Sequence, residues 1–345
     1  MESDRLDDAL TAFAATAPEF GGIGLSNHGP MAAEVLERLG RSDAIPGWSK
    51  AYGTRLDNAP PAASRPLGED EWPGALGDGA RYPEWLAHFE RELADRPVQA
   101  VVGEWAPRLA PGTVAAATHG LIRLAHGLRA WQAADTAPRR LEVAQGLAYW
   151  ASRYQELPGP PLLIGHQRVA EALAVLPYLP EETPIELLIS AQVGHVADIS
   201  DEFEQAVSSL GFSGTGTDLL DELASGGARA YLRNAEHGHA VALLHSVTGP
   251  LALELVLPWL AAEDRDAALA YAWQAVAALH VAYVVDRRSP DVGEGDPPPP
   301  DELVERAVAS GNEHALKLTE AVLRSYARSG DPHLLWAAAD ASARF

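Results

Sequence analysis

The stretch Asn312-Glu313-His314-Ala315-Leu316-Lys317-Leu318-Thr319-Glu320 sets the interpretation of the whole chain. Its apolar and polar residues alternate with the period of an α-helix, and it contains neither Gly nor Pro. On a helix, His314 and Lys317 project from adjacent turns of one face, with Glu320 a further turn along. The stretch therefore predicts a helix that carries a histidine and a lysine at the spacing of metal ligands.

A lysine is an unusual metal ligand, because its ammonium group carries three donors and no lone pair. Carboxylation by carbon dioxide would turn Lys317 into a carbamate, a hard oxygen ligand suited to iron, manganese or zinc. Of the 26 basic residues only Lys50 and Lys317 are lysines. A lysine that persists in so arginine-rich a chain is a candidate for chemistry that arginine cannot perform. The alternative is an ordinary amphipathic helix with a snorkelling lysine and a surface histidine.

The composition predicts an all-α protein. The chain has 345 residues, is 47% hydrophobic, is rich in alanine and leucine, and has few β-branched runs. No composition shift marks a second domain, and no fixed-period repeat is evident. We therefore expect a single large multi-helix bundle over residues 1–345, with long Pro/Gly-rich loops.

Charge and cysteine content exclude several classes of function. The formal net charge of -22 would repel phosphate backbones, so nucleic acid is not an expected partner. Without cysteine, disulfides, thiolate catalysis, iron–sulfur clusters and cysteine zinc sites are excluded. The acidic N-terminus lacks the order of a signal peptide, and we find no long uncharged apolar stretch for a membrane span, so we expect a cytoplasmic protein. An oligomer is compatible with these features.

The N-terminal part combines short helices with a long loop. Residues 3–16 form an amphipathic pattern, and a second helix begins near Asn27-His28-Gly29-Pro30-Met31 and stops at Gly40. A helix N-terminus disfavours the imidazolium form, so His28 would present the neutral ring that a metal requires; the alternative is a capping histidine. Residues 41–81 are rich in Pro, Gly and Asp and predict a loop or lid. Trp48 and Tyr52 in it could line a flat apolar pocket or anchor the loop to the core.

Two further histidines share a predicted helix over residues 113–131. His119 and His126 are seven residues apart and face the same way on an apolar stripe. Polar groups on a buried stripe are costly unless each has a partner, so the pair raises the expectation of a site there. Neighbouring helices are expected over 83–107 and 142–155.

The C-terminal part of the chain also has a histidine on a predicted apolar helix. His245 lies in a strongly apolar helix from Ala240 through Leu260, and Pro250 predicts a kink or fresh start just after it. Another helix is expected over 267–285, followed by a flexible, acidic, proline-rich connector over 286–300 and a helix pair from Asp301 to Phe345. The glycines between 211 and 216 match neither G-x-G-x-x-G nor a P-loop, so we assign them no nucleotide role.

The histidines expected to be buried come from several separate helices, and a helical bundle can bring such residues together on one interior metal. A nitrogen-rich site of this kind suits iron, copper or zinc better than magnesium or calcium. These histidines are His28, His119, His126, His245, His280 and His314.

At these residues the chain resembles the questin oxidase-like proteins of fungal anthraquinone pathways and their bacterial relatives. The resemblance runs through Asn27-His28-Gly29-Pro30-Met31, His119-Gly120-Leu121-Ile122, Leu244-His245-Ser246-Val247-Thr248 and Glu313-His314-Ala315-Leu316-Lys317. It implies an oxygenase that opens a ring of a polycyclic aromatic polyketide, by Baeyer–Villiger oxidation or by iron-dependent dioxygenation. It also implies a non-haem Fe(II) centre with four histidines and a carboxylated lysine, here His28, His119, His245, His314 and Lys317.

Under this hypothesis the substrates are a small aromatic quinone or phenol and O2, and the ring opens by oxidative carbon–carbon cleavage. His126, Trp48 and Tyr52 are left as candidate catalytic or substrate-facing residues. An NADPH-dependent Baeyer–Villiger monooxygenase or hydroxylase is an alternative, although no dinucleotide fingerprint and no flavin motif occur. A non-catalytic helical binding or scaffold protein is the alternative of another class.

Overall fold

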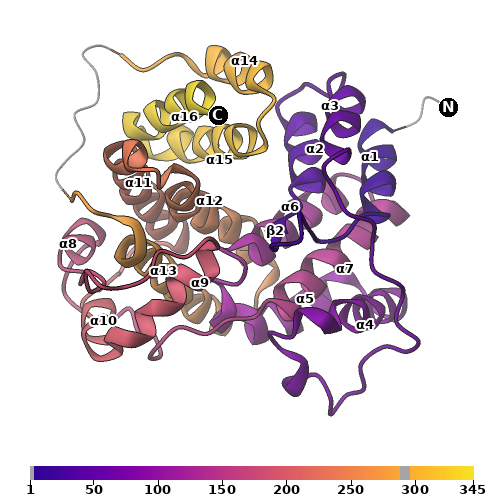
Figure 1. The fold of residues 1–345 in the computed structure, drawn as a ribbon, viewed down its shortest axis with the longest axis horizontal. Coiled ribbons are helices and arrows are strands. Elements are labelled where there is room, and N and C mark those ends of the chain that lie inside the picture. The colour runs from indigo at the N-terminus through magenta and orange to yellow at the C-terminus, as the bar shows by residue number, and fades with distance from the viewer. Residues whose placement is uncertain (1–3, 288–295) are drawn as a thin grey trace. The chain divides into compact units, whose positions relative to one another are not determined.

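The computed structural model describes residues 4–287 and 296–345; helices, joined by loops, make up 67% of the structure, and its two strands are short (Figure 1). The predicted all-α class is confirmed. The chain divides into two compact units: unit 1 is Met1–Gln155 with Leu255–Ala261, and unit 2 is Glu156–Glu254 with Ala262–Phe345. That the chain acts as one domain stays a prediction.

Unit 1 is built from seven α-helices of the described chain, one short hairpin and several 3-10 turns. Its α-helices are α1 (Arg5–Ala14), α2 (Gly29–Arg38), α3 (Ile45–Gly53), α4 (Tyr82–Asp95), α5 (Val98–Leu109), α6 (His119–Ala133) and α7 (Ala137–Ser152). β1 (Glu19–Phe20) pairs antiparallel with β2 (Leu25–Ser26). The 3-10 turns are η1 (Pro73–Ala75), η2 (Gly79–Arg81), η3 (Ala110–Gly112) and η6 (Leu257–Trp259).

Glycines let α6 and α7 pack closely at the centre of unit 1. A Cβ atom on Gly120 of α6 would lie 2.6 Å from the Trp150 Cα of α7, and one on Gly146 of α7 would lie 2.7 Å from the Leu124 Cα of α6. Side chains at either position would push the helices apart, so glycine is required there by packing. The buried Arg123 side chain crosses the same helix pair to the Glu142 carboxylate, with an Nε to Oε1 distance of 2.7 Å. This packing fixes the face of α6 that carries His119 and His126.

Unit 2 is built around the apolar helix α12. Its helices are α8 (Val169–Ala174), α9 (Ile189–Gly194), α10 (Ser200–Val207), α11 (Gly216–Asn234), α12 (Ala240–Val256), α13 (Ala262–Tyr283), α14 (Pro300–Ser310), α15 (Glu313–Ser329) and α16 (Pro332–Arg344), with 3-10 turns η4 (His195–Ile199) and η5 (Ala235–His237). Side chains of α11, α12, α15 and α16 form a common hydrophobic core that includes Tyr231, Leu244, Leu318 and Leu335. α15 is thereby held with its Lys317 face turned inward.

Several predicted boundaries are corrected. Residues 45–53 of the predicted 41–81 loop form α3, because Pro46 starts a helix and Ile45 and Tyr52, two turns apart, are both buried. The predicted helix over 113–131 begins only at His119. The predicted C-terminal helix pair is three helices, because Gly311 and Gly330 adopt positive φ and end α14 and α15.

A fresh start after His245, one of the two expected outcomes, is wrong, since α12 continues through Pro250 to Val256; a kink at Pro250 stays a prediction. Pro250 cannot donate to the Ser246 carbonyl, and Gly227 of α11 packs against that carbonyl instead. Ala240–Trp259 passes the length and hydropathy test for a membrane span, contrary to the sequence prediction. Because 78% of its tested 18-residue window is buried, the stretch also fits the core helix of a globular unit. Residues 288–295 of the predicted 286–300 connector lie outside the described residues.

Candidate metal centre

His28 lies at the N-terminus of α2 in unit 1, as predicted, and is 5% exposed. Its side chain makes no capping bond, because the Asn27 Oδ1 atom caps the helix by accepting from Gly29 N–H at 2.9 Å. The His28 backbone N–H donates to the Tyr52 hydroxyl at 2.9 Å. Trp48 stacks on the Tyr52 ring with centroids 4.9 Å apart. α3 therefore supports the backbone of His28. The imidazole of His28 is not used for capping.

His119 begins α6 directly after a left-handed run. Ala116, Ala117 and Thr118 have φ values of 46°, 57° and 66°, a conformation that costs a residue with a Cβ about 1 kcal/mol. The run brings the Ala116 carbonyl to 2.6 Å from His119 Nδ1, which donates to it. Because Nδ1 carries the proton, the lone pair of the neutral ring lies on Nε2. The His119 ring lies 4.6 Å from the His28 ring, centroid to centroid.

His126, two turns further along α6, belongs to a buried ion-pair group. Its Nδ1–H donates to Glu34 Oε2 at 2.7 Å, and Arg129 donates to both oxygens of the same carboxylate, at 2.7 Å from Nε and 2.6 Å from a terminal nitrogen. Burial alone would raise the pKa of Glu34, but Arg129 and His126 lower it to about 2. Glu34 was not singled out in the sequence. Its position on α2, among the buried residues that follow Pro30, is the only signal that could have indicated it.

In unit 2, His245 of α12 is completely buried. Its Nδ1–H donates to the Val241 carbonyl at 2.7 Å, so its lone pair also lies on Nε2. Burial lowers the pKa of His245 to about 3, and the charge of Lys317 lowers it further in the same direction. The neutral ring that a metal ion requires is therefore the stable form of His245 at neutral pH.

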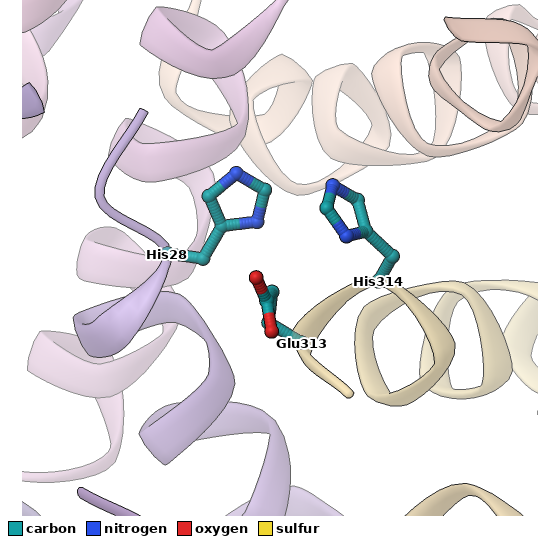
Figure 2. A group of neighbouring side chains, drawn as sticks. All are labelled: His28, Glu313 and His314. Carbon is teal, nitrogen blue, oxygen red and sulfur yellow. The ribbon is translucent and has the colours of Figure 1, made fainter. Parts of the chain in front are cut away.

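α15 carries the remaining candidates on its first two turns. Asn312 caps the helix by accepting from His314 N–H at 2.8 Å. Figure 2 shows the Glu313 carboxylate and the His314 imidazole projecting from this first turn, and shows His28 at the start of α2. The His314 ring was expected to be buried but is only half-buried, at the first turn of α15; it lies 6.0 Å from the His245 ring. Glu313 is 5% exposed and was not assigned a role from the sequence, although it stands next to His314.

Lys317 is the most unusual group of the site. It is 1% exposed, and its Nζ atom has no hydrogen-bond partner within residues 4–287 and 296–345. Burial lowers the pKa of Lys317 to about 7, and Glu313, one helical turn earlier, opposes the shift. The snorkelling alternative is not supported, because a snorkelling lysine keeps its ammonium group in water.

The donors in each unit, taken separately, are of the kind that binds a metal ion. Unit 1 pairs His28 with His119, and unit 2 gathers His245, His314 and Lys317. In each unit one imidazole has its Nδ1–H committed to a backbone carbonyl, which is the usual way of fixing a metal-binding tautomer. The buried Nζ atom of Lys317 lacks a hydrogen-bond partner among the described residues. A carbamate at this position would instead have the metal ion as its partner. His280 is buried as predicted but bonds its own helix carbonyl and is not part of either group.

Comparison with known proteins bears on this assignment. The sequence model of the questin oxidase-like family matches residues 48–210. Among the candidate residues this segment contains Trp48, Tyr52, His119 and His126. No curated protein matches the chain. The family points to an oxygenase that acts on aromatic polyketides. The suspected resemblance to the questin oxidase-like family is therefore confirmed over residues 48–210.

Proposed function

We propose that this protein is a non-haem iron oxygenase that uses O2 to open a ring of a polycyclic aromatic polyketide or quinone. His28, His119, His245 and His314 would supply imidazole nitrogens to the iron, and Lys317 would supply a carbamate oxygen. When bound, Fe(II) would supply the one-electron chemistry that allows singlet organic substrates to react with dioxygen. Every other requirement of the reaction falls on the side chains described below.

The observation that carries the proposal is the buried, unpartnered amine of Lys317. An ammonium ion without a partner is costly inside a protein, because burial removes its hydration. The ammonium group first loses one proton, and the neutral amine then forms an N–C bond between Nζ and carbon dioxide with loss of a second proton, so the cation becomes an anion with two acceptor oxygens. Such a group is stable only beside a cation or donors, and a metal ion held by His245 and His314 would provide that cation.

The second support is the fixed tautomer of the histidines. The Ala116 and Val241 carbonyls hold a proton on Nδ1 of His119 and His245, at 2.6 and 2.7 Å. In the neutral form both rings therefore present the lone pair of Nε2. Tyr52 holds the backbone of His28 in place, so the point from which its ring projects is fixed before any ligand arrives.

His126 and the aromatic pair Trp48 and Tyr52 would contact or surround the substrate. Glu34 accepts the Nδ1 proton of His126, so the lone pair on Nε2 could accept a proton from a phenol. The indole of Trp48 is only partly buried and offers a flat surface against which an aromatic ring can stack. These roles are proposals for substrate binding and are separate from the metal-ligand assignment.

The test is oxygen consumption by iron-loaded protein with polycyclic quinones and phenols, followed by mass spectrometry of the products formed under 18O2. Ring opening without NADPH and with two labelled oxygen atoms per product supports the proposal. A requirement for NADPH with one labelled atom would replace it by the Baeyer–Villiger reaction. Absence of oxygen uptake by iron-loaded protein across such a panel would favour a helical binding protein.

A further inference from the structure

Unit 2 contains a cavity of about 1050 Å³ that none of its proposed iron ligands lines. Its walls come from α8, α11, the C-terminal half of α13 and the end of α15. On α15 the first lining residue, Arg328, lies eleven positions after Lys317, which is about 16 Å along the helix axis. The cavity is therefore separate from Lys317, His245 and His314 within this unit.

One side of the cavity is apolar. Its apolar lining residues include Val169 and Leu173 of α8, Ala230 of α11, and Val284 just after α13. The volume is at the upper end of the range of small-molecule sites, which bury most of a drug-sized ligand. The shape and lining suit a ligand with a sizeable hydrophobic body.

The charges around the cavity largely cancel. Arg168 pairs with Glu222 at 3.5 Å, Arg229 with Asp331 at 2.8 Å, and Arg328 with Asp221 at 2.7 Å; these six residues all line the cavity. A phosphate would have to compete with these carboxylates for each guanidinium group. The lining therefore disfavours a nucleotide cofactor and favours a ligand without net charge.

Arg287 is the exception, since it has no carboxylate partner in the described part of the chain. Its guanidinium donates to the carbonyls of Leu176 and Pro177 and lies 3.7 Å from the centroid of the Tyr178 ring. Its Nε atom is buried and makes no hydrogen bond to any described residue. Arg287 thus brings to the cavity wall a guanidinium group that forms no ion pair with a described carboxylate.

His280 lines the same cavity. After the Nε atom of Arg287, it provides a second buried atom that has no hydrogen-bond partner among the described residues. It is 4% exposed, and its Nδ1–H donates to the Val276 carbonyl at 2.9 Å. Its Nε2 atom has no hydrogen-bond partner in residues 4–287 or 296–345. Burial lowers the pKa of His280 to about 4, and the charge of Arg287 contributes in the same direction, so the two side chains interact. The neutral ring offers Nε2 as an acceptor.

We propose that this cavity binds a neutral polycyclic phenol, whose hydroxyl donates to His280 Nε2 while its oxygen accepts from the Arg287 guanidinium. A hydroxyl group satisfies both atoms because it is donor and acceptor at once. The fused rings lie against Val169, Leu173, Ala230 and Val284. This inference goes beyond the proposed function in assigning a second binding site, and it rests on that function for the polycyclic aromatic class of the ligand.

The experiment compares 2-hydroxyanthraquinone with 2-methoxyanthraquinone, which keeps the ring system and the oxygen acceptor but lacks the proton. Affinities are measured by quenching of tryptophan fluorescence in the full chain after removal of metal with a chelator. We expect the hydroxy compound to bind about five- to tenfold more tightly to the wild-type protein, as one hydrogen bond allows. Because metal and oxygen are absent, failure of the iron proposal would leave this result untouched.

Three variants test whether His280 and this cavity form the binding site. In His280→Leu the preference for the hydroxy compound should fall to within about twofold, whereas His88→Leu, a change of a buried histidine in unit 1, should keep it. Ala230→Phe should weaken both compounds by filling the cavity. Equal affinities in the wild-type protein, no binding of either compound, a preference that persists in His280→Leu, or displacement by NADPH would each overturn the proposal.

Discussion

The imidazole rings of His28 and His119 lie 4.6 Å apart, and each is held there by a bond that does not involve the face of its ring. The Tyr52 hydroxyl holds the His28 backbone, and the Ala116 carbonyl holds His119 Nδ1. The pair is therefore oriented in advance, as a metal-binding pair has to be.

Loss of the Tyr52 hydroxyl should destabilise unit 1. In Tyr52→Phe the His28 N–H keeps its buried position but loses its acceptor, which costs about 1–2 kcal/mol. Urea unfolding followed by tryptophan fluorescence measures the change. The control Tyr178→Phe alters a tyrosine that is 53% exposed and should change stability by less than about 0.5 kcal/mol. Equal effects of both substitutions would mean that the bond to His28 contributes nothing.

The left-handed run before α6 predicts an unusual response to glycine. Ala117 has φ 57°, whereas Ala115 does not have a positive φ, and both are buried. Replacement by glycine removes one buried methyl group at either position but relieves strain only at Ala117. We expect Ala117→Gly to be more stable than Ala115→Gly by about 1 kcal/mol in urea unfolding. The reverse order would show that the run is not strained.

Glu34 should make stability depend on acid pH. Its folded-state pKa, about 2, lies below the ordinary value of 4.5, so the unfolded chain binds more protons between these values. The contribution is present above pH 4.5 and is lost as the pH falls towards 2. By linkage it is about 3 kcal/mol.

The measurement is urea unfolding between pH 6 and pH 2.5, comparing the wild-type protein with Glu34→Gln. The variant should be less stable at pH 6, because Arg129 loses its carboxylate, and its stability should fall less steeply with acid. Glu69→Gln, a change of an exposed carboxylate, should follow the wild-type curve. Parallel curves for the wild type and Glu34→Gln would contradict the shifted pKa.

Much of the fold and part of the site could be predicted from the sequence. Apolar periodicity and composition indicated the helices, and the burial of His28, His119, His126, His245 and His280 followed from their place on apolar stripes. Helix ends were harder to predict from the sequence. The left-handed conformation of Ala116–Thr118, for example, depends on tertiary contacts, which the helix propensities of the residues do not describe. α3 was missed because Pro and Gly dominate its surroundings.

The polar partners of the site were the part that could not be predicted. Glu34 and Arg129 stand on different helices, and only packing of α2 on α6 brings them together. The lack of a hydrogen-bond partner for Lys317 Nζ among the described residues is likewise a property of the folded unit. The sequence shows that a lysine is present but not which groups surround it. Sequence spacing selects candidate ligands, whereas burial and hydrogen bonding decide which of them are poised to bind.

The most direct test of the iron proposal is the metal content of protein purified without oxygen from iron-supplemented cells. We predict close to one iron per chain in the wild type and in Lys50→Ala, which changes the one other lysine, an exposed one. We predict loss of iron in Lys317→Ala, because the carbamate oxygen can no longer form. Full iron occupancy in Lys317→Ala, or a wild-type protein that retains no iron, would contradict the proposed centre.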